Sequence, residues 1–196
     1  MTMRLFLALT TLLLSPSLTF AHSGGHAGGF VHGFEHPIGG IDHVLAMVAV
    51  GVFAFVLGGR ALWAVPLSFV GMMLVGFLLG SAQIGLPHVE LGIAASSIAI
   101  GALAAAGRSL PVSLAAVLVG IFAVFHGHAH GAEMPADASG LTYGLGFLVA
   151  TGLLHLIGIG VTAAVAKLVG RHGTAIARLA GGALTLGGVG VLAGWL

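Results

Sequence analysis

Six long apolar stretches, joined by short polar connections, make up most of the chain. They cover residues 41–57, 62–84, 89–106, 110–125, 141–169 and 175–195. A helix that crosses a bilayer needs about 20 consecutive, mainly apolar residues, and most of the stretches are close to that length. The sequence therefore predicts an all-α membrane protein with six transmembrane helices.

Composition excludes the other broad classes. Hydrophobic residues make up 58% of the chain and charged residues 6%, whereas an ordinary soluble domain carries about 25% charged residues. The six Lys and Arg residues are too few for the basic surface that nucleic-acid binding needs. The chain contains no cysteine, so a metal site would have to use His, Asp, Glu and backbone ligands. The lipid bilayer is the expected partner, and nucleic acid is not.

Glycine is abundant, with 34 residues, many of them inside the apolar stretches. Small residues four positions apart let the backbones of two membrane helices approach closely. Pairs with this spacing are Gly76/Gly80, Gly140/Gly144, Ala183/Gly187 and Gly190/Gly194. They support a compact, glycine-rich bundle without identifying a particular interface.

Residues 1–21 have the features of a cleaved secretory signal peptide. A basic Arg4 precedes an apolar run, and Thr19 and Ala21 are small residues at the positions that a signal peptidase reads. A retained first transmembrane helix is the less favoured alternative, because the apolar run is short and Pro16 interrupts it. Cleavage would leave residues 22–40 as an exported segment rich in His and Gly, too polar and flexible to span, before a transmembrane domain over 41–196.

The charges predict the orientation. Basic residues lie in alternate connections: Arg60, Arg108, Lys167, Arg171 and Arg178. Such residues mark the cytoplasmic side of a membrane protein. The acidic residues lie at the opposite ends of the stretches: Glu35, Asp42, Glu90, Glu133 and Asp137. With six spans, both termini would lie on the periplasmic side of a bacterial inner membrane.

The first group of candidate ligands is His36, Asp42 and His43, at the start of the first span. Ionisable residues are costly in hydrocarbon, so a cluster of them is a functional hypothesis by default. Gly39 and Gly40 would let the backbone bend so that the three side chains converge. Imidazole with carboxylate suits a divalent nickel, cobalt, copper or zinc ion.

The second group is His126, His130 and Glu133, at the end of the fourth span. On a helix these three share one face while His128 points away. Both groups would lie at the exported ends of their spans and could form one metal site. Further candidate ligands are His22, His88, Glu90, His128 and His155.

Two of the remaining histidine features have alternative interpretations. His155 lies inside the fifth stretch, either as a hydrogen-bonded contact between helices or as a second metal position or proton acceptor. His22, His26 and His32 in the exported segment either capture metal from dilute solution or belong to a disordered leader.

Two motifs carry a resemblance to a known family. His36-Pro37 followed by Ile41-Asp42-His43, together with the stretch from Phe125 to Glu133, resembles the HupE/UreJ nickel permease family over essentially the whole mature chain. The resemblance implies uptake of nickel, or in some members cobalt. It also implies that transport depends on His36, Asp42, His43, His126, His130 and Glu133.

The expected function is thus a permease that moves Ni²⁺ inward as its substrate, with no organic cofactor and no enzymatic activity. The chain has no nucleotide-binding motif, and a negative-inside potential of 100 mV would drive a divalent cation inward by about 4.6 kcal/mol. The alternative is an intramembrane zinc-dependent hydrolase that uses the same His and Asp residues. It is disfavoured because catalytic zinc usually has three protein ligands and no separate acid–base residue stands out.

Overall fold

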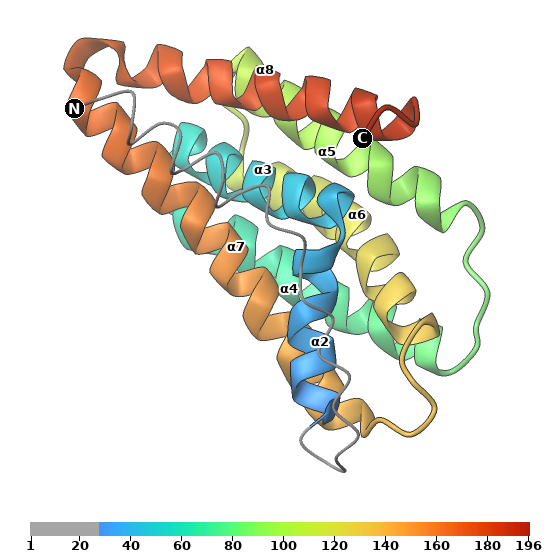
Figure 1. Cartoon of the computed structure of the whole chain (residues 1–196). Coiled ribbons are helices and arrows are strands. Elements are labelled where there is room, and N and C mark those ends of the chain that lie inside the picture. The colour runs from blue at the N-terminus through green and yellow to red at the C-terminus, as the bar shows by residue number, and fades with distance from the viewer. Residues whose placement is uncertain (1–27) are drawn as a thin grey trace, which may run out of the picture.

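The computed structural model describes residues 28–196, and every regular element in that range is a helix. The helices are α2 (Gly28–Gly39), α3 (Ile41–Leu57), α4 (Ala61–Ser81), α5 (Val89–Ala106), α6 (Val112–Ala132), α7 (Gly140–Val169), the single 3₁₀ turn η1 (Gly170–His172) and α8 (Gly173–Leu192) (Figure 1). The predicted signal peptide over residues 1–21, and His22 and His26, lie outside the described residues.

The all-α prediction is confirmed, and each of the six apolar stretches coincides with one helix from α3 to α8. Four helical segments are long and apolar enough to cross a membrane, or five if the bent α2–α3 pair counts as one span. The last segment, Gly140–Leu192, contains both α7 and α8, and the chain reverses direction between them at η1 (Figure 1). The chain is therefore a multi-pass membrane protein by length and hydropathy.

The histidine-rich segment before α3 differs from the prediction, because residues from Gly28 onward form helix α2 rather than a flexible leader. α2 packs along α7, and Gly33 and Gly146 allow this contact. A Cβ atom at Gly33 would collide with the backbone of Tyr143, and one at Gly146 with the backbone of Phe30. The glycines that make this segment look like a linker are therefore what lets it pack as a helix.

α4 and α6 also pack closely through glycines, with two glycines on each helix. Gly76 and Gly80 of α4 face the backbone of α6, while Gly127 and Gly131 of α6 face the backbone of α4. Among the glycines of the four predicted small-residue pairs, only Gly76 and Gly80 approach the backbone of another helix in the described structure. This interface holds the histidine-bearing end of α6 in place.

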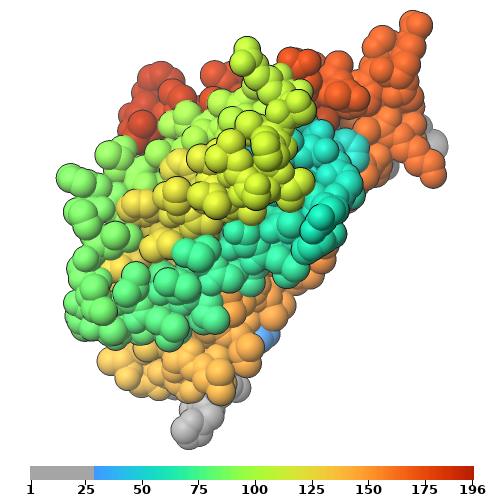
Figure 2. Space-filling model, turned by 180° about the vertical axis from the view of Figure 1, so that it is seen from behind, coloured from blue at the N-terminus to red at the C-terminus, as the bar shows by residue number. Residues whose placement is uncertain are grey.

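α3 is the central helix, since it contacts α4, α5, α7 and α8 and nine of its 17 residues are buried. Seen from behind, α6 lies between α4 and α5 (Figure 2). Large apolar side chains cover the outside of the bundle, among them Leu67, Leu78, Val117, Ile121, Leu156 and Val161. Such an apolar exterior is what lipid contact requires.

Candidate metal centre

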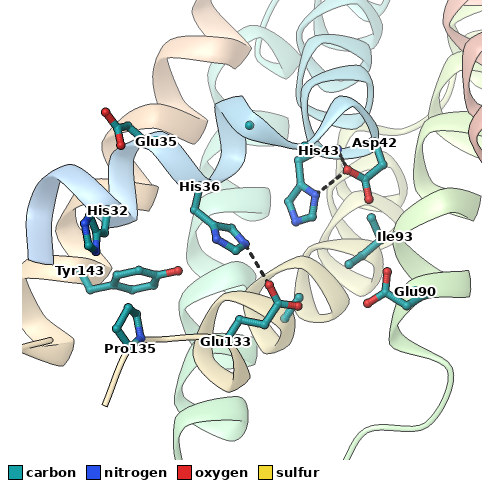
Figure 3. A pocket seen from close by; sticks show the side chains of 13 residues that line it. His32, Glu35, His36, Asp42, His43, Glu90, Ile93, Glu133, Pro135 and Tyr143 are labelled. Atoms are coloured by element: carbon teal, nitrogen blue, oxygen red, sulfur yellow. Dashed lines mark hydrogen bonds and ion pairs between the residues drawn. The ribbon is translucent and has the colours of Figure 1, made fainter. Parts of the chain in front are cut away.

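A cavity of about 570 Å³ opens at the end of the bundle where α2 meets α3, α6 ends and α7 begins. His36, Asp42 and His43 of the first predicted ligand group line it, together with Glu133 of the second (Figure 3). Its polar lining consists of His32, Glu35, His36, Asp42, His43, Glu90, Glu133 and Tyr143. The fold thus brings together two motifs whose first histidines, His36 and His126, are 90 residues apart in the sequence.

Three imidazoles form the centre of the site. One ring nitrogen from each of His36, His43 and His130 lies within 4.8 Å of the other two. The ring centroid of His130 is 4.7 Å from that of His36 and 5.1 Å from that of His43. Because metal–imidazole bonds are about 2.1 Å long, small side-chain rotations would bring these nitrogens to bonding distance of one ion.

The break between α2 and α3 aims two of these rings at the centre. The axes of the two helices differ by 81°, with Gly40 in an extended conformation before the first residue of α3. His36 and His43 therefore do not share one helix face but converge from either side of the bend. The bend predicted at Gly39 and Gly40 is confirmed, and it leaves the ring centroids of His36 and His43 6.0 Å apart.

Asp42 holds the ring of His43 in a defined orientation. Its Oδ1 atom accepts hydrogen bonds from Nδ1 of His43 at 2.9 Å and from the backbone N–H of His43 at 2.8 Å. The Nε2 atom of His43 is then free of the carboxylate and has no hydrogen-bond partner in the described structure. A carboxylate behind an imidazole in this way fixes its tautomer and raises its basicity as a metal ligand.

Glu133 brings the second carboxylate to the centre. It follows the last residue of α6, and its Oε2 atom lies 3.2 Å from Nε2 of His36 (Figure 3). The side chain of Glu133 is 53% exposed and that of His36 29%. The pair therefore forms the solvent-facing side of the centre, while His130 is fully buried.

His126 lies one helical turn deeper than His130 and does not line the cavity. Its ring centroid is 4.9 Å from that of His43, and its Nε2 atom lies 2.9 Å from the hydroxyl oxygen of Ser96. The Ser96 hydroxyl donates to the Ile93 carbonyl, so it accepts from the His126 ring. The other nitrogen, Nδ1, has no partner among the described residues.

Three residues at the site were not predicted from the sequence. Ser96 positions His126, Tyr143 lines the cavity, and the ring of Phe147 stacks on His130 with centroids 4.8 Å apart and planes 7° apart. Tyr143 and Phe147 are four positions apart on α7, a spacing that indicates a shared helix face. Aromatic residues at that spacing usually form ordinary core, so the signal was present but not specific.

Among the further ligand candidates, Glu90 lines the cavity, and so does His32 from the segment predicted to be exported. His88 is exposed at the start of α5. Nε2 of His128 donates to the Ile84 carbonyl at 2.8 Å, away from the centre. The prediction that His128 points away from its neighbours is confirmed, and His22 lies outside the described residues.

His155 is buried on α7, and neither of its ring nitrogens has a hydrogen-bond partner among the described residues. The interpretation of His155 as a hydrogen-bonded contact between helices is therefore wrong. Sequence could not decide this, because a partner on another helix is a property of packing.

Acidic side chains are concentrated at the cavity. Four of the five acidic residues of the chain, Glu35, Asp42, Glu90 and Glu133, line it. A cleft of one charge sign between low-dielectric walls raises the local concentration of oppositely charged ions. The cavity is thus built to attract cations to three imidazoles.

An apolar helical bundle with a buried histidine cluster beneath an acidic cavity defines a multi-pass membrane protein with a candidate metal centre. The chain belongs to the HupE/UreJ family, since the model of that family, described as HupE / UreJ protein, matches residues 9–191. Protein HupE of Rhizobium leguminosarum bv. viciae is 46% identical over 179 residues, which cover 91% of this chain and 92% of that protein. No solved structure gives a significant match. The family resemblance of the two motifs is confirmed.

Proposed function

We propose that this protein is a secondary transporter that takes up Ni²⁺ from the periplasm to the cytoplasm without ATP hydrolysis, with Co²⁺ as the alternative substrate. The observation that supports this most directly is the group of three converging imidazoles under an acidic cavity in a membrane bundle. Membership of the HupE/UreJ family agrees with a transport role.

The donor set supports a divalent transition metal as the substrate. Imidazole nitrogens and carboxylate oxygens, with no thiolate, suit nickel and cobalt better than the soft Cu⁺ ion. The carboxylate-rich rim would attract the hydrated ion, and His36, His43, His130 and Glu133 would replace part of its water shell. A centre with ligands on both its open and its buried side can accept an ion from water and pass it inward.

The proposed orientation places the cavity on the periplasmic side of the inner membrane. The basic residues Arg60 and Arg108 lie in the α3–α4 and α5–α6 connections, at the ends of α3 and α5 remote from Asp42 and Glu90. By the positive-inside rule those connections are cytoplasmic. A cleaved signal peptide over residues 1–21 belongs to the same proposal, and inward movement would then follow the membrane potential.

The proposal is tested by uptake of radioactive nickel into cells that express the chain. We expect uptake above that of empty cells, loss of uptake in His43→Ala, and unchanged uptake in His172→Ala, a matched control that removes an exposed histidine remote from the cavity. Competition by excess cobalt sets the selectivity. No uptake by the wild-type chain, at verified membrane expression, would overturn the proposal and return attention to the hydrolase, which no feature of the described residues favours over transport.

A further inference from the structure

One face of α7 leads from the cavity into the middle of the bundle. Tyr143, Phe147, Thr151 and His155 follow one another at intervals of four, so they form a stripe along the helix. Tyr143 lines the cavity and Phe147 stacks on the ligand candidate His130. At 1.5 Å per residue, His155 lies about 12 Å beyond Phe147 along the helix axis, near the middle of the 30-residue helix.

α4 supplies the opposite wall of this stripe. The hydroxyl of Thr151 donates to the sulfur of Met73 at 3.6 Å, and the ring of His155 meets that of Phe69 edge-on, with centroids 5.1 Å apart. α4 runs antiparallel to α7 here, so moving four residues along α7, from Thr151 to His155, corresponds to moving four residues back along α4, from Met73 to Phe69. A thioether, a hydroxyl and an imidazole thus occupy adjacent turns of one interhelical contact.

The His155 imidazole is buried without a hydrogen-bond partner among the described residues. Its exposed fraction is 1%, and neither ring nitrogen has a hydrogen-bond partner in the part of the chain that the structure describes. A buried polar group without a partner is unfavourable and uncommon in native proteins, and a bound ion is one of the features that accounts for it. The neighbouring Thr151 is satisfied by Met73 and does not use His155.

Contacts connect His155 to the three-histidine centre. The ring of Phe69 lies 5.1 Å from that of His155 and 5.5 Å from that of His126, between centroids. His126 in turn lies 4.9 Å from His43. A series of ring contacts therefore connects His43, at the cavity, with His126, then Phe69 and then His155.

Resting on the proposed transport function, we propose that His155, with the Met73 thioether and Thr151 beside it, forms a second, inner binding position for the transported metal ion. The ion reaches it from the His36–His43–His130 centre by way of His126. An imidazole with a free lone pair is a ligand for Ni²⁺ or Co²⁺, and sulfur and oxygen donors on adjacent turns complete a weak site. A weak site is what transfer toward the cytoplasm needs, because an ion held tightly in mid-membrane would not leave.

The first experiment separates binding from transport. We expect His155→Leu to bind Ni²⁺ at the outer centre within about threefold of the wild-type Kd, yet to take up nickel at least tenfold more slowly in proteoliposomes. His43→Ala, by contrast, loses both. Wild-type uptake by a folded His155→Leu would overturn the inner position while leaving the transporter intact. Absence of uptake by the wild-type protein would instead overturn the proposed function.

A second variant detects ligation directly. Because the chain contains no cysteine, His155→Cys introduces a single thiol. We expect Co²⁺ to produce a thiolate-to-metal charge-transfer absorption in this variant and not in Leu154→Cys, a matched control at a neighbouring buried position on another face of α7. If folded His155→Cys binds Co²⁺ at the outer centre without that absorption, the inner position is wrong.

Discussion

The α4–α6 and α5–α8 helix pairs pack by the same means and carry different chemistry. Both bring glycine against the backbone of the partner helix, through Gly127 and Gly131 in the first pair and Gly101 and Gly181 in the second. α6 also carries buried histidines, two of which meet His43 of α3, whereas α8 has no buried ionisable residue. Close packing by glycine is therefore a general feature of this bundle, and the imidazoles distinguish the end that holds the candidate metal centre.

The α6 motif shows how packing and chemistry share one helix. Gly127 and Gly131 are four apart and face α4, and His126 and His130 are also four apart, on the neighbouring face. His126 and His130 meet the ring of His43 on α3 instead. The glycines thus fix the rotation of α6, and that rotation aims the imidazoles.

The largest expected effect comes from breaking the α4–α6 contact. A Cβ atom in Gly127→Ala would collide with the carbonyl of Met73, a backbone atom that cannot give way. We expect stability to fall by about 3 kcal/mol and nickel uptake per folded molecule to be lost, because α6 is displaced. Thermal unfolding of the purified protein and uptake normalised to folded protein would measure both.

The matched control is Gly181→Ala in the α5–α8 pair, where Cβ would meet the backbone N of Ala105 at 2.6 Å. It should lose comparable stability but keep its uptake per folded molecule, since α8 holds none of the ligand candidates. Equal retention of uptake in both variants would show that the two contacts do not differ in function.

The next effect sharpens the comparison within α6. His130→Ala removes a fully buried imidazole of the centre, and we expect uptake to fall at least about 100-fold, since loss of a group behind a ligand already costs 10–100-fold. His128→Ala, which removes the hydrogen bond to the Ile84 carbonyl, should stay within about twofold in uptake and lose about 1 kcal/mol of stability. Similar losses of uptake in both variants would contradict the assignment of His130.

A smaller effect is expected from replacing Asp42, the carboxylate that bonds to the ring of His43. Asp42→Asn keeps the shape of the side chain and removes its charge, so nickel affinity should weaken by about 10-fold or more. Ser97→Ala, in the α5–α8 half, removes a buried hydroxyl that bonds only to the Ala94 carbonyl of its own helix and should leave affinity unchanged. Isothermal titration with Ni²⁺ would report both values, and an unaltered Kd in Asp42→Asn would show that Asp42 does not support the centre.

The smallest effect concerns the rim of the cavity. Glu35→Gln removes one charge from the lining, so uptake at low ionic strength should fall about threefold, and the difference should disappear at high salt because exposed charges are screened. Asp137→Asn is the control, since Asp137 is the acidic residue outside the lining. A salt-independent difference would indicate that Glu35 contacts the ion instead of steering it.

Much of the bundle is readable from local sequence. The apolar runs predict α3 to α8 because the hydropathy of a spanning segment is a property of consecutive residues. Spacing on a helix likewise places His130 with His126 and turns His128 away. Helix α2 was not predicted, because Gly28–Gly39 looks polar and flexible until α7 is there to pack against it.

The sequence alone therefore determined the helical class, the family and the six principal ligand candidates, all of which rest on residue type and short-range spacing. The tertiary structure decided that His36, His43 and His130 form the central group, that Ser96 and Phe147 position imidazoles, and that His155 has no hydrogen-bond partner in the described residues. These features depend on how closely and at what rotation helices meet. Glycine contacts between distant segments set both, and no short window of sequence contains them.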